Sequence, residues 1–220
     1  MRRTTLAVVL VLFASAVPAQ AQFAPKFGLI GGANLTHVDL TDPARPPSDI
    51  YHGQTVPGAG AVVLFPVADR LAVRMDLIWL SKGQTVSGKE FNSDAGSLDL
   101  TFFEVPVLAV VDILGGRLRP YVIAGPSFGL LLNASVYDPT LAGSSDVNYA
   151  FDTLELSLIA GGGVAYQARR ARFFIETRYA RGLNNIEAER FTVPGGSTPF
   201  VNTETMKTRG VQIMIGVTAR

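Results

Sequence analysis

The chain has no cysteine in its 220 residues, which excludes disulfides, thiol catalysis and lipid attachment through a cysteine. Charged residues make up only 17%, the formal net charge is +1, and no basic run occurs, so we expect no nucleic-acid partner. Beyond the N-terminus there is no apolar run of about 20 residues, the length that a spanning helix needs. Hydrophobic residues nevertheless make up 48% of the chain. Such a chain must bury its apolar surface in a core or show it to lipid through closed strands.

Residues 1–21 have the features of a secretory signal peptide. Arg2 and Arg3 form a charged start, an apolar stretch runs from Leu6 to Val17, and a small-residue cleavage site ends at Ala21. About 12 apolar residues are too few to span a bilayer, which disfavours a membrane anchor. We expect cleavage after Ala21 and a mature domain of residues 22–220, whose formal charge falls from +1 to −1 when Arg2 and Arg3 are removed.

After this signal, apolar and polar residues alternate with a period of two, which is typical of strands with unlike faces. Eight segments show the pattern: residues 27–35, 59–67, 70–79, 98–112, 118–132, 154–167, 172–179 and 210–218. In the segment 98–112 the phase changes near Phe102 and Phe103, which predicts a bulge there. Pro106 lacks an N–H donor and also argues against a regular ladder in that strand.

The connections between these segments alternate between long and short. Residues 38–57, 84–97, 133–152 and 184–207 are long connections, whereas residues 66–70, 114–116 and 168–171 form short ones. Outer-membrane barrels have short periplasmic turns and long outer loops. The sequence therefore predicts an all-β fold, an eight-stranded antiparallel up-and-down transmembrane β-barrel in the bacterial outer membrane. An even strand number, together with the export signal, places both termini in the periplasm.

The distribution of charge indicates which face of each strand is outside. Charged residues share faces with glycine and serine, while the apolar faces carry no charge, as expected where one Arg or Lys at mid-depth in lipid costs about 2–4 kcal/mol. A soluble ligand-binding barrel would instead have an apolar lumen and a polar exterior. Six aromatic residues near strand ends are expected to face outward and to form a girdle at each membrane–water interface: Phe27, Phe65, Trp79, Tyr166, Phe173 and Tyr179. We expect a structural charge network in the lumen: Arg74, Asp76, Glu104, Arg119, Glu155, Glu176 and Arg178.

Candidate catalytic or ligand-binding residues have weak support. His37 and His52 flank the first long connection, but no metal-ligand spacing or nucleophile motif accompanies them. Gly161 to Gly163 lie within a strand pattern, so close packing or a bend in the barrel wall explains them better than a phosphate-binding loop. Asp76 and Glu104 could form an acid/base pair, yet ion pairing with arginines explains both. We expect no catalytic residue, metal or cofactor.

Several segments resemble the PorT-like, or outer membrane protein beta-barrel domain, family. The matching stretches are FGLIGGANL (27–35), LIWLSKG (77–83), FEVPVL (103–108), RPYVIAGP (119–126), ETRY (176–179), GLNNI (182–186) and RGVQ (209–212). Together they span nearly the whole mature chain. The resemblance implies an eight-stranded outer-membrane barrel and no uniform biochemical activity.

Four hypotheses about function follow from the sequence. The first is a non-catalytic barrel with a side-chain-filled lumen, whose long extracellular loops carry a structural or surface-binding role. The second is a rim-located enzyme that modifies membrane lipid with His37 or His52. The third is a narrow channel or a secretion-system component, and the fourth is the soluble barrel. The expected partners are outer-membrane lipid and, during assembly, the barrel insertion machinery; the extracellular ligand is not specified by the sequence.

Overall fold

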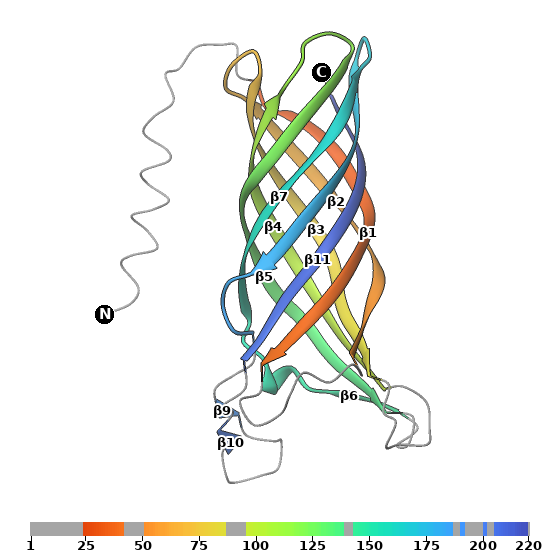
Figure 1. The fold of residues 1–220 in the computed structure, drawn as a ribbon, viewed down its shortest axis with the longest axis vertical. Coiled ribbons are helices and arrows are strands. Elements are labelled where there is room, and N and C mark those ends of the chain that lie inside the picture. Colours follow the sequence, from red (N-terminus) through yellow and green to blue (C-terminus); the bar gives the residue numbers. More distant parts are fainter. Residues whose placement is uncertain are drawn as a thin grey trace, which may run out of the picture.

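The computed structural model describes residues 24–41, 51–86, 96–138, 143–186, 190–191, 200–201 and 205–219. Most of these residues lie in long tilted strands around one axis (Figure 1). The barrel strands are β1 (Lys26–Thr41), β2 (Tyr51–Pro66), β3 (Leu71–Val86), β4 (Gly96–Asp112), β5 (Leu118–Asp138), β7 (Leu154–Gln167), β8 (Ala171–Gly182) and β11 (Thr205–Ala219). The shorter elements are β6 (Gly143–Asp146), β9 (Arg190–Phe191), β10 (Phe200–Val201) and the 3-10 helix η1 (Asn148–Ala150).

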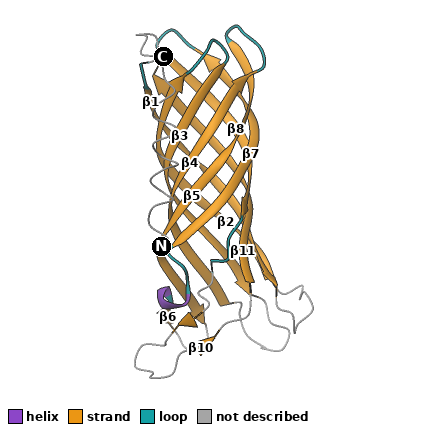
Figure 2. Ribbon diagram, turned by 90° about the vertical axis from the view of Figure 1, so that its left-hand side faces the viewer, coloured by secondary structure: helices purple, strands orange, loops and turns teal. Residues whose placement is uncertain are grey.

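The eight long strands close into a cylinder. Each pairs antiparallel with its neighbour in chain order, and β11 returns to pair with β1. β6 extends the sheet locally by pairing with the end of β5, and β9 pairs with β10. The predicted eight-stranded antiparallel up-and-down barrel is therefore confirmed (Figure 2). No helix among the described residues is long and apolar enough to span a membrane.

The two ends of the barrel differ. The short turns 67–70, 113–117 and 168–170 lie at one end, where β1 begins and β11 ends. The strand ends that the longer connections join lie at the other end (Figure 1). We call these the turn end and the loop end. The strands run further toward the loop end than predicted: β1 continues to Thr41 and β2 begins at Tyr51, because backbone pairing continues beyond the apolar part of each strand. The predicted signal peptide lies outside the described residues.

β8 shows how the period-two pattern produces the two walls. Four side chains face outward and are exposed: Phe173, Ile175, Thr177 and Tyr179. The alternate four are buried in the lumen: Phe174, Glu176, Arg178 and Ala180. Successive side chains of a strand point to opposite faces, so a closed sheet sends one set outward and the other to the axis.

Gly161 and Gly163 allow β7 and β8 to approach closely. A Cβ atom at Gly161 would lie 2.2 Å from the Thr177 carbonyl oxygen, and one at Gly163 would lie 2.3 Å from the Ile175 carbonyl oxygen. Any side chain at either position would force the two backbones apart. The packing role predicted for these glycines is confirmed, and a phosphate-binding loop is excluded here because β7 continues through them without a following helix.

The predicted bulge is present, but it belongs to the neighbouring strand. Thr101 of β4 pairs with Asn133 of β5, whereas Phe102 pairs with Leu131, so Leu132 is the extra residue. Burial along β4 alternates without interruption, so the prediction of a phase change inside this strand was wrong. The ladder around Pro106 is irregular as expected. Met75 pairs with Val107 and Ile78 with Glu104, and the pairing between β3 and β4 is interrupted between these two positions.

Candidate functional site

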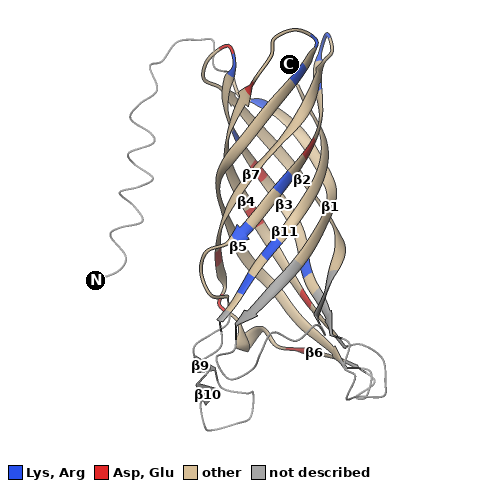
Figure 3. Ribbon diagram, viewed as in Figure 1, with Lys and Arg blue, Asp and Glu red and all other residues tan. Residues whose placement is uncertain are grey.

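The lumen of the barrel contains a central cluster of charged side chains from β3 and β8. These two strands are not neighbours in the sheet, so their side chains meet across the axis. Figure 3 marks the charged positions along the ribbon. Arg74 donates two hydrogen bonds to Glu176, at 2.9 and 2.7 Å. Arg178 donates to Glu176 and to Asp76, both at 2.6 Å, and Arg74 Nε lies 3.1 Å from Asp76 Oδ1. The four groups are at most 3% exposed and form a closed ring of alternating charge.

Two aromatic side chains complete the central cluster. The Tyr121 hydroxyl donates a hydrogen bond of 2.5 Å to Glu176 Oε2. The Arg74 guanidinium lies 5.2 Å from the centre of the Phe174 ring, within reach of a cation–π interaction. Buried ions are tolerated only when opposite charges and hydrogen bonds surround them, and this cluster provides both.

A second cluster lies nearer the loop end and is organised around Lys82. The Lys82 ammonium is 2.5 Å from Glu104 Oε1 and 2.6 Å from Glu155 Oε2. The Thr208 hydroxyl donates a hydrogen bond to Glu155. The ammonium also lies 4.8 Å from the centre of the Phe102 ring. One cation therefore joins carboxylates from β4 and β7, which lie on either side of β5 in the sheet.

The third cluster is at the turn end. Asp112 accepts hydrogen bonds from Arg172, at 2.7 and 3.2 Å, and from Arg119, at 3.2 Å. Arg119 is 26% exposed and also donates to the Gly116 carbonyl, so it belongs to the mouth of the barrel. The Arg172 guanidinium lies 5.3 Å from the Tyr121 ring centre, which connects this cluster to the central one.

The residues predicted as one lumen network therefore form three. Arg74, Asp76, Glu176 and Arg178 meet in the centre, Glu104 and Glu155 share Lys82, and Arg119 lies apart with Asp112. The sequence prediction missed Lys82, Asp112 and Arg172. Each has the same strand parity as a residue that it did include, so continuing the alternation to the strand ends would have found all three. With them the clusters hold five cations and five anions: Arg74, Lys82, Arg119, Arg172 and Arg178 with Asp76, Glu104, Asp112, Glu155 and Glu176.

Apolar side chains fill the space between and beyond the ionic clusters. One group of buried apolar side chains packs together along most of the lumen: Ile30, Val62, Leu64, Ile78, Leu80, Leu108, Val110, Ile123, Ile159, Phe174 and Met214. A second group lies toward the loop end, and we call it the apolar cap: Leu98, Leu100, Phe102, Ala134, Ile186 and Met206. The lumen is thus more apolar than the sequence predicted, because a filled barrel interior excludes water and is packed as a protein core.

The cavities described beside the central and turn-end clusters are small. A cavity of about 10 Å³ lies beside Arg74, Tyr121 and Phe174, which is room for about one water molecule. A pocket of about 80 Å³ opens at the turn end beside Asp112 and Arg172. Most of the exposed large apolar residues lie on the outer wall of the barrel strands, with Leu29 at 66% and Ile175 at 54% exposed. All six predicted girdle aromatics are exposed there: Phe27, Phe65, Trp79, Tyr166, Phe173 and Tyr179.

The geometry does not support the acid/base pair considered from the sequence. Asp76 contacts two arginines in the central cluster, whereas Glu104 contacts Lys82 in the next one. Within the described part of the chain no three His, Cys, Asp or Glu residues are grouped as a metal site would require. The side chains of His37 and His52 lie outside the described residues, so the rim site proposed for them has no structural description.

An apolar outer wall around an ion-paired, filled lumen defines a membrane-embedded β-barrel. The chain belongs to the outer membrane protein beta-barrel domain family, whose model matches residues 20–188, and this family places it in the bacterial outer membrane. No curated protein matches the chain.

Solved structures of outer-membrane proteins share the fold, and two of them are compared with this chain. The outer membrane protein OprG from Pseudomonas aeruginosa is 14% identical, with a TM-score of 0.54 over 92% of this chain and 99% of that one. Neisserial surface protein A (NspA) is 16% identical, with a TM-score of 0.50 over 89% of this chain and 98% of that one. At these identities the likeness concerns the fold alone.

Proposed function

We propose that the protein is a non-catalytic outer-membrane barrel that does not conduct, and that its long loop-end connections carry a structural or surface-binding role. The carrying observation is the filled lumen. Three ionic clusters lie one above another along the axis, and the apolar cap packs beyond them toward the loop end. An eight-stranded barrel is only just wide enough for such a filling.

We propose further that the turn end faces the periplasm and the loop end faces outward. One support is that the short turns lie at the end of the barrel where β1 begins and β11 ends. The other is the export signal predicted in residues 1–21. The connecting segments 42–50, 87–95, 139–142 and 192–199 contain much Ser, Thr, Asn, Asp, Gly and Pro, a composition suited to water-exposed loops.

Recordings from planar lipid bilayers test the closed lumen. The purified protein is expected to give no resolvable conductance steps. An ion could cross the lumen only by separating the ion pairs of all three clusters. A conducting porin reconstituted in the same bilayer is the positive control. Reproducible steps from the folded protein would contradict a closed lumen and favour the channel.

Replacement of each connection by a glycine–serine linker tests the loop-borne role. Loss of a surface-binding activity or phenotype, with heat-modifiable migration of the folded barrel unchanged, is the expected outcome for at least one connection. If every linker variant kept all activities of the native protein, the role would have to be assigned elsewhere.

The rival proposals make different predictions. A rim enzyme that uses His37 or His52 would turn over labelled phospholipid in detergent, and His37→Ala or His52→Ala would abolish this turnover. A secretion-system component, suggested by the PorT-like part of the resemblance, would copurify with other envelope proteins. The filled lumen favours the non-conducting barrel over a channel.

A further inference from the structure

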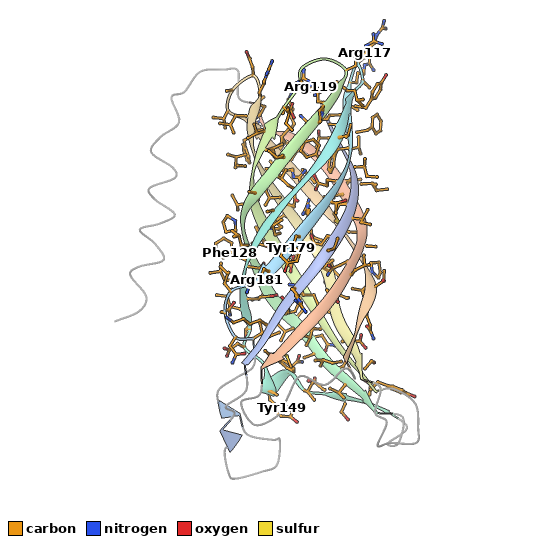
Figure 4. The ribbon with its side chains drawn as sticks, in the orientation of Figure 1. Arg117, Arg119, Phe128, Tyr149, Tyr179 and Arg181 are labelled. Atoms are coloured by element: carbon orange, nitrogen blue, oxygen red, sulfur yellow. The ribbon has the colours of Figure 1, made fainter. Side chains whose placement is uncertain are left out.

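The turn end of the barrel carries more positive than negative charge. Six charged side chains line the pocket of about 80 Å³ in its mouth: Lys26, Asp69, Arg70, Asp112, Arg119 and Arg172. Three further arginines are exposed on the short turns at this end: Arg117, Arg169 and Arg170. Figure 4 shows Arg117 and Arg119 there. The described residues of the turn end therefore include seven cations and two carboxylates.

This excess is a local property, because the whole chain has a formal net charge of only +1. The connections of the loop end have the opposite balance in the sequence. Seven acidic and two basic residues occur in the segments 42–50, 87–95, 139–142, 187–189, 192–199 and 202–204. The positive charge is thus concentrated around one mouth of the barrel, where it attracts anions from the surrounding water.

Asp112 fixes the positions of two arginines in the pocket. It accepts hydrogen bonds from Arg172, at 2.7 and 3.2 Å, and from Arg119, at 3.2 Å. Arg119 Nε also donates to the Gly116 carbonyl. One carboxylate therefore holds two guanidinium groups, and each guanidinium has more N–H donors than these bonds use.

Arg70 contributes the third guanidinium, from the turn between β2 and β3. Its Nη1 atom lies 3.5 Å from the Ile113 carbonyl oxygen of the turn between β4 and β5. Lys26 lines the pocket as well, but it makes an interaction of its own, so the inference rests on the three arginines. These arginines outnumber the pocket carboxylates even when both Asp69 and Asp112 are counted.

The pocket opens on the lumen side of the wall. Leu64 and Val110 line it, and both belong to the buried apolar group of the lumen. Lipid headgroups surround the outer wall of a barrel, so a ligand reaches this pocket from the water beyond the turn end. A volume of about 80 Å³ gives room for a few water molecules or one small oxyanion.

We propose that the mouth at the turn end binds an oxyanion between Arg70, Arg119 and Arg172. The oxyanion is a carboxylate or phosphate group of a molecule in the water at that end. A guanidinium presents a planar set of donors that matches the oxygens of either group. The site is separate from the loop-borne role; only the name of the compartment, the periplasm, depends on the proposed orientation.

Titrations followed by NMR of the arginine Nε–H groups test the site. The folded protein in a neutral detergent is titrated with sodium phosphate, with sodium acetate or with phosphatidylglycerol, at constant ionic strength so that screening does not change. Phosphate and acetate distinguish a phosphate source from a carboxylate source. Arg70→Gln/Arg119→Gln is expected to bind the tighter of these two anions roughly tenfold more weakly, because each exposed ion pair contributes a factor of up to about five. Asp112 keeps both bonds from Arg172 in this variant, so the barrel should fold.

The matched control is Arg117→Gln/Arg170→Gln, which removes two exposed turn-end cations outside the pocket and has the same net charge as the test variant. It is expected to retain native affinity. Equal weakening in both double variants would overturn the proposal, since it would show an effect of net charge. Native affinity in the test variant would also overturn it, as would a response to phosphatidylglycerol without a response to phosphate or acetate.

Asp112→Asn gives a second readout, in the opposite direction. The native carboxylate competes with a bound anion for Arg119 and Arg172, and the amide oxygen of asparagine can still accept a hydrogen bond from Arg172. Loss of the competing charge is expected to strengthen the binding of phosphate or acetate about fivefold, by the same factor for one ion pair. Unchanged or weaker binding by Asp112→Asn would contradict the site.

Discussion

Replacing Arg178 by methionine is expected to lower the free energy of unfolding by about 3–5 kcal/mol, the usual cost of breaking a buried ion pair. Arg178 is completely buried and contacts both Asp76 and Glu176. Methionine fills much of the same volume but leaves two carboxylates with Arg74 as their one remaining cation in the central cluster. Reversible urea unfolding in lipid vesicles, followed by tryptophan fluorescence and by heat-modifiable migration, measures the difference.

Two variants separate the loss of charge balance from the loss of packing. Asp76→Asn/Arg178→Met removes one charge of each sign and leaves the Arg74–Glu176 pair intact, so it should recover a large part of the lost stability. Arg170→Met removes an exposed turn arginine and should change stability by less than about 0.5 kcal/mol. A change below about 1 kcal/mol for Arg178→Met would show that this cluster does not stabilise the lumen.

Replacing Lys82 by methionine is the second substitution with a large expected effect, again about 3–5 kcal/mol. Lys82 is the cation shared by Glu104 and Glu155, and both carboxylates are buried. Without the ammonium, two like charges face each other in a dry interior, with the Thr208 hydroxyl as a donor to one of them. The same unfolding experiment measures the loss.

Removal of one of these carboxylates should rescue the Lys82 variant. Lys82→Met/Glu104→Gln leaves one carboxylate, Glu155, with its hydrogen bond from Thr208, and is expected to be more stable than Lys82→Met alone. Lys82→Arg preserves the charge in a larger group and should lose less stability than Lys82→Met. If Lys82→Met/Glu104→Gln were less stable than Lys82→Met, the destabilisation could not be assigned to facing carboxylates.

The barrel and its two walls could be predicted from the sequence because both follow from strand periodicity. Alternation along β8 places Glu176 and Arg178 on one face and Ile175 and Tyr179 on the other, whatever the neighbouring strands are. The even number of such segments and the alternating connection lengths then specify an up-and-down barrel. No long-range information was needed for that step.

The pairing inside the lumen could not be predicted in the same way. Arg74 and Glu176 are 102 residues apart and come from strands that do not pair with each other. Which charges meet depends on strand tilt and stagger, which set the height of each side chain along the axis. The pattern of residues along one strand does not specify the height of a side chain along the barrel axis. The sequence prediction therefore grouped Arg119 with the central charges, although it lies at the turn end beside Asp112.

The apolar part of the lumen was missed for a related reason. Leu80 and Ile159 are fully buried in the lumen, on strand faces that also carry charge. From a single strand such a face looks amphipathic. Only closure of the barrel shows that each face borders a dry interior, where apolar side chains pack between the ionic clusters. The extra residue Leu132 was also assigned to the wrong strand, because a bulge is a property of a strand pair.

The chain's single tryptophan offers the most direct test of the central claim, that apolar side chains face lipid while ions face the axis. Trp79 is 57% exposed on the outer wall, between lumen-facing Ile78 and Leu80. In vesicles, brominated phospholipid should quench most of its fluorescence, and aqueous iodide should quench little. Strong quenching by iodide with no effect of brominated lipid would contradict the account, because the wall that carries Trp79 would then face water.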